Sequence, residues 1–233
     1  MIVDTWPCKS ADGHVSEELA VHLKTEGSTF RVLVIPPLFA EHNLMRRQLV
    51  EVMRQLHSAR VDCVLPDLPG QNESLEPLSK QTLGCWRDAV VEASRTFDAT
   101  SILAVRSGAL LVPENAEGWL YAAQPGAKLL KGMIRARVIA SREAGVTESS
   151  DDLFKLGRQE GITLGGWQIG ASMFGELEAA TTPAQTKWVE IAQKDVGGPG
   201  LWLRAEPDEN AAQAAKLAEI ILSDIPEEAK ASA

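Results

Sequence analysis

This chain has few histidines, and all of them lie within its first 57 residues. The four histidines among its 233 residues are His14, His22, His42 and His57, so none follows residue 57. Cysteine is also sparse: Cys8, Cys63 and Cys85 form no CxxC pair. A small, odd number of cysteines does not build a disulfide framework, and a structural zinc site usually draws on such pairs. The sequence therefore predicts no disulfide scaffold, no metal site and no cofactor.

Long apolar runs and excess positive charge are lacking as well. No stretch of about 18 apolar residues occurs, which predicts no membrane-spanning segment. The N-terminal sequence has no basic start followed by a continuous apolar core, so we expect no signal peptide and a cytoplasmic protein of bacterial type. The formal net charge of −9 disfavours binding to nucleic acid.

The chain instead alternates short apolar runs with amphipathic stretches. We expect buried strands at 30–35, 61–65, 102–105 and 118–123, an irregular strand at 162–169, and late strands at 187–192 and 201–203. We expect helices at 43–58 (N-cap Asn43), 79–96 (N-cap Ser79), 125–142 and 209–224, and a loop with a short helical turn at 149–161. Such alternation predicts an α/β fold, with a mainly parallel sheet and helices on both faces.

Several motifs add a family resemblance to this pattern. The segments VIPPLFAEHNLMRR, VLPDLPGQNES and LAVRSGALL, followed by GGWQI and GGPGLWL, resemble the α/β-hydrolase fold. More narrowly, they resemble the hydrolase-like proteins associated with the exosortase A system of Gram-negative bacteria. The resemblance covers most of residues 30–205 and implies a small helical cap near 125–162. It also implies a link to exopolysaccharide production and protein sorting, with a protein of that system as a partner. From length and composition we expect one domain over 1–225 and a flexible tail at 226–233.

The catalytic motif of this fold is altered. The nucleophile of an α/β-hydrolase occupies the centre of G-x-S-x-G, on a strained turn between a strand and a helix. With the last glycine aligned on Gly108, that centre is Arg106, and Ser107 comes one residue late. An arginine stays protonated and cannot attack a carbonyl carbon. The base should lie C-terminal to the nucleophile, where this chain has no histidine. We therefore expect a catalytically degenerate protein.

Weaker candidates keep a hydrolytic alternative open. Ser107 would be the nucleophile of an unconventional esterase or thioesterase, with Asp195 as the acid or His42 as a rearranged base. Asp67 follows a predicted strand, where it either places a charge at the mouth of the site or, as we favour, bonds the backbone amides of a turn.

Arg106 also has a non-catalytic interpretation. Ligands of open parallel sheets bind beyond the carboxyl ends of the strands, and a guanidinium there would receive a small carboxylate or phosphate. Donors would come from the backbone near Leu38 and Phe39, and Trp167 could line the pocket. The competing expectation is that Arg106 pairs internally with Glu41, which would close the site so that it binds nothing.

The predicted helix at 125–142 carries one basic face. Lys128, Lys131, Arg135 and Arg142 follow one another at spacings of 3, 4 and 7 residues. This face is either simply solvated or a docking surface for anionic lipid or an acidic partner.

Overall fold

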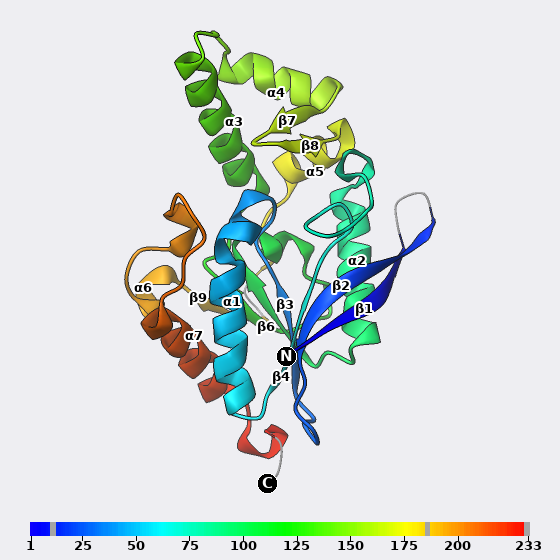
Figure 1. Ribbon diagram of the computed structural model, residues 1–233, viewed down its shortest axis with the longest axis vertical. Coiled ribbons are helices and arrows are strands. Elements are labelled where there is room, and N and C mark those ends of the chain that lie inside the picture. The colour runs from blue at the N-terminus through cyan, green and yellow to red at the C-terminus, as the bar shows by residue number, and fades with distance from the viewer. Residues whose placement is uncertain (10–12, 185–186, 231–233) are drawn as a thin grey trace.

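Seven strands form the central sheet, in the order β1-β2-β4-β3-β5-β6-β9 (Figure 1). The computed structural model describes residues 1–9, 13–184 and 187–230. The strands of this sheet are β1 (Ile2–Lys9), β2 (Val15–Leu23), β3 (Arg31–Ile35), β4 (Asp62–Pro66), β5 (Ser101–Val105), β6 (Gly118–Tyr121) and β9 (Trp188–Ile191). β1 and β2 form an antiparallel hairpin, and β2 is also antiparallel to β4. The remaining neighbours are parallel, which confirms the predicted α/β class.

The order of strands reverses beside β3. The chain passes from β3 to β4 on one side and then returns to β5 on the other side. In open parallel sheets such a reversal leaves a space beyond the carboxyl ends of the strands, because successive connections leave in opposite directions. The segments after β3 and after β5 therefore meet at the place where this architecture binds ligands.

Two apolar layers hold the sheet between helices. In β3, Leu33 and Ile35 belong to the layer shared with α2 (Leu83–Thr96), while Val32 and Val34 belong to the layer shared with α1 (Ala40–Ser58) and α7 (Ala211–Asp224). Alternate residues of a strand face opposite sides, so a strand covered on both sides must be apolar throughout. This explains why the central strands appear in the sequence as uninterrupted apolar runs.

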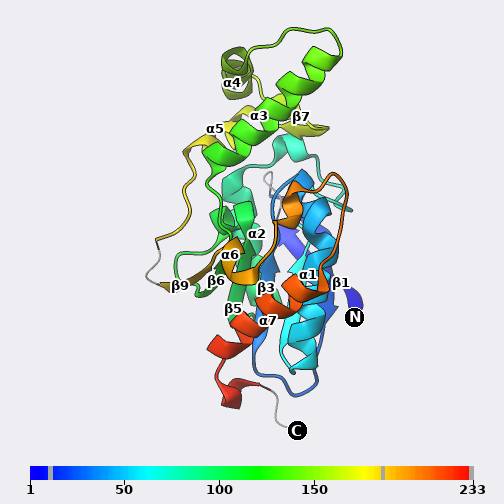
Figure 2. The ribbon, with the colours of Figure 1, turned by 90° about the vertical axis from the view of Figure 1, so that its left-hand side faces the viewer.

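An outer layer covers the carboxyl edge of the sheet (Figures 1 and 2). It contains α3 (Gly126–Glu143), α4 (Ser150–Gln159), the hairpin β7 (Ile162–Leu164) and β8 (Trp167–Ile169), and α5 (Ala171–Ala179). The layer is closely packed: a Cβ on Gly157 of α4 would lie 2.5 Å from the Phe174 ring of α5. Among the described residues, no helix is long and apolar enough to cross a membrane.

Several predicted boundaries were wrong for local reasons. The first helix begins at Ala40 rather than after Asn43, with Phe39 at the N-cap. The second begins at Leu83, because the Thr82 hydroxyl accepts a hydrogen bond from the Cys85 amide; Ser79 lies in a separate 3-10 turn, Leu78–Lys80. Further helical elements in the described ranges are α6 (Gln193–Val196) and the 3-10 segments Arg106–Leu111, Leu201–Leu203 and Glu227–Ala229.

Three further expectations need correction. The predicted loop at 149–161 contains α4, whose Ser149 N-cap accepts a hydrogen bond from the Asp152 amide. The run 201–203 is a 3-10 turn and not a strand. The irregular strand at 162–169 is a hairpin, because Gly165 and Gly166 both adopt positive φ and reverse the chain. Positive φ strains most other residues, so glycines mark this turn.

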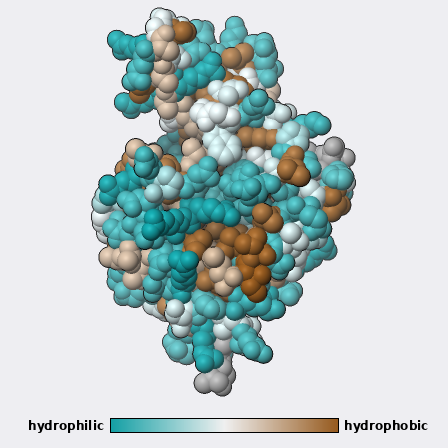
Figure 3. Space-filling view, in the orientation of Figure 1, coloured by the Kyte–Doolittle hydropathy of each residue, from teal (hydrophilic) through white to brown (hydrophobic). Residues whose placement is uncertain are grey.

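Strand β1 forms an open edge of the sheet. Ile2 and Val3 are 55% and 62% exposed, and the space-filling view shows a brown, apolar area over this part of the molecule (Figure 3). On the inner side of the same strand, Trp6 and Cys8 are fully buried. The hairpin β1–β2 therefore contributes to the core while leaving one edge unpaired among the described strands.

Candidate functional site

The turn after β5 keeps the geometry of a nucleophile elbow. Arg106 has φ 55°, in the left-handed region that costs energy for a residue with a side chain. Gly108 is required here, since a Cβ would lie 2.4 Å from the Pro36 carbonyl oxygen and 2.7 Å from that of Ile35. The turn leads into a six-residue 3-10 helix, followed by Val112 and Pro113. The backbone of an elbow is thus present, with an arginine at its tip.

The Arg106 guanidinium makes four hydrogen bonds to groups of the same chain. Its Nε and Nη2 donate to Glu41 Oε2 and Oε1, each at 3.1 Å. Nη1 donates to the Ala122 carbonyl oxygen at 3.2 Å, and Nη2 also donates to Gln124 Oε1. The guanidinium carbon lies 4.2 Å from the centre of the Trp202 ring, a cation–π distance. Arg106 is only 8% exposed, and the expected internal pairing with Glu41 is confirmed.

Ser107 points into the fold and not toward an open site. It is 0% exposed, and its Oγ accepts a hydrogen bond from the Leu38 amide at 2.9 Å. The Leu38 amide lies in the segment expected to supply backbone donors to a bound anion, so one of those donors is already used. In this arrangement Ser107 ties the segment after β3 to the segment after β5.

His42 belongs to a different buried cluster. Asn72 Nδ2 lies 3.1 Å from its Nδ1, Arg46 Nη1 lies 3.1 Å from its Nε2, and Gln71 Oε1 lies 3.4 Å from its Nδ1. Burial, reinforced by the Arg46 charge, lowers the pKa of His42 to about 4. Within the described ranges, none of its hydrogen bonds reaches Ser107. A rearranged Ser107–His42 pair is therefore absent from this geometry.

Asp67 holds the same cluster together from the end of β4. It is fully buried, and its Oδ1 accepts from Arg46 Nη1 at 2.6 Å and from Asn72 Nδ2 at 2.7 Å. The favoured expectation of side-chain bonds to turn amides was wrong, because side chains of α1 and of the following loop provide the donors. Asp67 acts as a buried counter-charge for Arg46.

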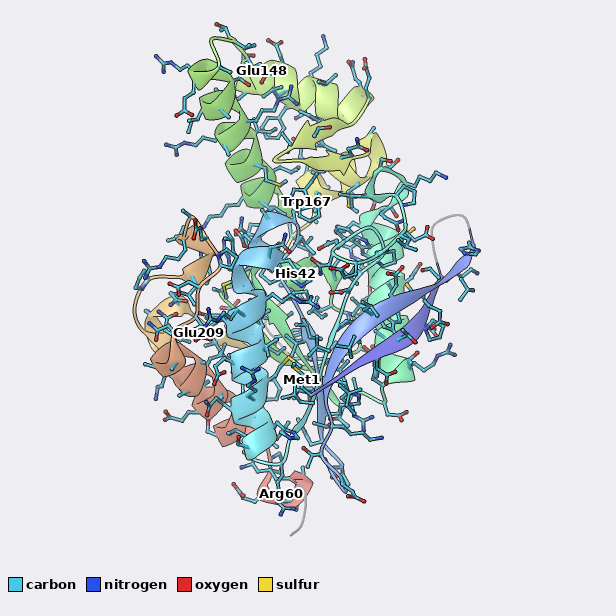
Figure 4. The ribbon with its side chains drawn as sticks, in the orientation of Figure 1. Met1, His42, Arg60, Glu148, Trp167 and Glu209 are labelled. Carbon is cyan, nitrogen blue, oxygen red and sulfur yellow. The ribbon has the colours of Figure 1, made fainter. Side chains whose placement is uncertain are left out.

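The remaining predicted site residues lie in separate places. Asp195 Oδ2 accepts from the Ala192 amide at 2.8 Å and so caps the short helix α6. Phe39 is buried, with φ 56°, and its ring lies 5.9 Å from that of Trp167. Figure 4 shows Trp167 where the outer layer meets the rest of the molecule. This ring contact joins the first turn of α1 to the outer layer. In the described part of the chain, no group of three His, Cys, Asp or Glu residues could hold a metal ion.

Besides the Ala122 carbonyl, two side-chain partners of Arg106 were not expected from the sequence. Gln124 is 5% exposed and follows β6, and its side-chain Oε1 accepts a hydrogen bond from Arg106 Nη2. Trp202 comes from the C-terminal segment, where a histidine base would be expected in an active enzyme. A polar residue directly after a predicted strand was a usable signal for Gln124. The apolar run LWL gave no such signal for Trp202, since it suggested a strand.

Comparison with known proteins supports the fold and nothing finer. The chain matches no family model and no curated protein sequence. Among solved structures it is similar to the mouse α/β hydrolase domain-containing protein 10, at 17% identity and TM-score 0.54, over 96% of this chain and 98% of that one. It also matches Smu.1393c from Streptococcus mutans, at 12% identity and TM-score 0.46, over 95% and 96% of the two chains.

Other matches cover less of their chains. An epoxide hydrolase from Vigna radiata matches at 18% identity and TM-score 0.40 over 53% of this chain, which spans 40% of that enzyme's length. The chain likewise spans 61% of a matched chain from Agrobacterium vitis. At these identities the likeness defines the fold alone. The protein has an α/β-hydrolase-like fold, with an arginine at the elbow.

Proposed function

We propose that this protein binds a small anionic ligand at a former hydrolase site and does not cleave it. One observation carries the proposal: the elbow position holds Arg106, whose charge is matched by a carboxylate, that of Glu41. A guanidinium recognises a planar carboxylate or a phosphate through two parallel hydrogen bonds. Glu41 occupies the place that the anionic group of a ligand would take.

The position of Arg106 supports a ligand site. It follows β5 directly, and Leu38 follows β3, so both lie where the strand order reverses. Glu41 is in the first turn of α1, and its side chain is 19% exposed against 10% for Arg106. A ligand anion can therefore approach from the Glu41 side and replace its carboxylate, while Gln124 and Trp202 continue to hold the guanidinium.

The binding proposal is tested by thermal stabilisation with a panel of small carboxylates, inorganic phosphate and phosphate esters. We expect at least one anion to raise the melting temperature of the wild type. Glu41→Gln should bind that anion more tightly, since the internal competitor loses its charge, and Arg106→Gln should not bind it. Arg47→Gln, which alters an exposed pair with Glu209, is the matched control. If no anion stabilises either the wild type or Glu41→Gln, the proposal fails.

The absence of hydrolysis is tested separately. Intact mass after treatment with a fluorophosphonate probe should show no adduct, because the Ser107 hydroxyl is buried and has no base among its contacts in the described structure. A single adduct that disappears in Ser107→Ala would instead establish an unconventional esterase or thioesterase. The folded state of both proteins is checked by circular dichroism, so that a negative result is meaningful.

The biological setting rests on the motif resemblance. The order of the PPLFAEHN, PDLPGQNES and GGPGLWL segments supports a place beside an exosortase and exopolysaccharide system, with a protein of that system as partner. In a bacterium that carries such a system, deletion of the corresponding gene should change exopolysaccharide output or protein sorting. Arg106→Gln should fail to restore the phenotype, whereas Arg47→Gln should restore it. An unchanged deletion strain would argue against the link.

A further inference from the structure

Helix α3 carries cations that have no ion-pair partner in the described part of the fold. Within residues 1–9, 13–184 and 187–230, no ion pair involves the exposed side chains of Lys128, Lys131, Arg135 or Arg142. Most other arginines do have a carboxylate partner, including Arg137 on the same helix, which pairs with Glu148. In a chain of net charge −9, this local excess of positive charge is a distinct feature of the surface.

The four cations share one face of α3. Their spacings of 3, 4 and 7 residues bring them into a row about 21 Å long, from the rise of 1.5 Å per residue. The buried side of the helix is formed by Leu129, Leu130 and Ile134, so the row faces away from the core. In Figure 2, α3 lies toward the viewer, at the end of the molecule formed by the outer layer.

Two exposed apolar side chains accompany the row. Ile139 is 50% exposed and lies four residues after Arg135 and three before Arg142, on the same face. Val146 is 54% exposed, in the turn that follows the helix. The Arg137–Glu148 pair and the bond from Ser141 to Glu148 hold this turn against α3. The surface of α3 therefore presents a row of cations with apolar side chains toward one end, and the contacts of Glu148 hold the following turn in place.

We propose that this α3 face, defined by Lys128, Lys131, Arg135, Ile139 and Arg142, docks on an anionic lipid membrane. A planar anionic surface can contact every member of a straight row at once, whatever the spacing of its charges. Each lysine or arginine near such a surface strengthens attachment about fivefold. Ile139 can enter the headgroup region between Arg135 and Arg142, and Val146 can enter it beyond the end of the row. An acidic protein would need carboxylates at positions that match the four cations. Such ion pairing would also leave Ile139 and Val146 without an apolar region to enter.

The test is co-sedimentation with vesicles of phosphatidylcholine containing phosphatidylglycerol, with pure phosphatidylcholine vesicles as reference. The wild type should bind the anionic vesicles only, and added salt should weaken binding. The triple variant Lys131→Gln, Arg135→Gln, Arg142→Gln should bind at least about 50-fold more weakly, from the factor per charge given above. Ile139→Ser should weaken binding severalfold and leave its salt dependence unchanged.

The matched control removes the same charge elsewhere. Lys24, Lys80 and Lys194 are exposed, and no ion pair of the described residues involves them. Their triple replacement by glutamine should leave vesicle binding within about fivefold of the wild type. The proposal is overturned if the wild type does not bind anionic vesicles, or if the two triple variants lose binding equally. It is also overturned if the wild type binds immobilised polyglutamate but not vesicles, which would make the face a protein-docking surface.

Discussion

Arg106 Nε and Nη2 each lie 3.1 Å from an oxygen of Glu41, which joins the end of β5 to the first turn of α1. Both side chains are largely removed from solvent. Replacing one member of such a pair leaves a buried charge without its counter-charge, which costs more than the pair itself contributes. The first prediction follows from this asymmetry.

Glu41→Gln should lower the free energy of unfolding by about 3 kcal/mol, because the Arg106 guanidinium keeps its charge in a poorly solvated place. The measurement is urea-induced unfolding. Glu51→Gln is the control, since it removes the carboxylate of a more exposed pair with Arg54 and should cost less than about 1 kcal/mol. Equal, small losses in the two variants would mean that the Arg106–Glu41 pair is effectively solvated.

Two glycine-to-alanine changes should have opposite effects. A Cβ at Gly108 would collide with the Pro36 and Ile35 carbonyl oxygens, so Gly108→Ala should cost at least about 2 kcal/mol. Gly132 lies exposed within α3 and has nothing within 4 Å of its added Cβ. Gly132→Ala should therefore stabilise the protein by about 0.5–1 kcal/mol. Thermal and urea unfolding of both variants measure this, and a neutral Gly108→Ala would show that the elbow can shift.

Stability should fall when the medium is acidified through the range set by His42. Its pKa in the folded protein is about 4, against 6.5 ordinarily, so the unfolded chain takes up a proton that the folded protein excludes. The contribution of neutral His42 to the free energy of unfolding is complete above about pH 6.5. It decreases by up to about 3 kcal/mol as the pH falls toward 4. Urea unfolding at a series of pH values measures the slope. His42→Asn should flatten it in this window, and an unchanged slope would assign the effect to other groups.

The protection of the turn after α3 from amide hydrogen exchange should depend on the charge of Glu148. Hydrogen bonds from Arg137 and Ser141 lower the pKa of Glu148 to about 2, so the carboxylate stays ionised, and the contact persists, until the pH falls toward that value. Glu148→Gln should speed amide hydrogen exchange in residues 144–149 at neutral pH, because the charge that holds Arg137 is lost. Glu143→Gln, an exposed change in the last turn of the helix, should leave exchange there unchanged. Equal exchange rates in both variants would contradict this role.

The sequence predicted the parts of the fold that are buried on two sides. Strands β3, β4 and β5 are covered by helices on both faces, so their apolar runs have few other interpretations. The hairpin β1–β2 was not predicted, because much of β1 is exposed and the buried Glu18 interrupts the apolar pattern of β2. Helix α4 was predicted only as a short helical turn within a loop, since it buries only Leu153 and Gly157.

The candidate site was predicted only where its contacts follow from the order of the strands. The pairing of Arg106 with Glu41 follows from topology. Arg106 comes directly after β5, and Glu41 comes just after the short loop that follows β3, the parallel neighbour of β5. The contact of Arg106 with Trp202 joins segments about a hundred residues apart, and nothing local to either residue indicates it. Asp67 was correctly placed at a strand end, but its partners depend on how α1 packs beside β4.

The open edge at β1 has a consequence for how these molecules behave when crowded. An eight-residue edge strand with exposed Ile2 and Val3 is a template onto which a strand of another molecule could pair. Pro7 interrupts that template, since proline has no N–H to offer an incoming strand. The same residue lies between buried Trp6 and Cys8, so the strand stays anchored where it is least able to recruit a neighbour. Pro7 therefore disfavours the edge-to-edge strand pairing through which such sheets aggregate.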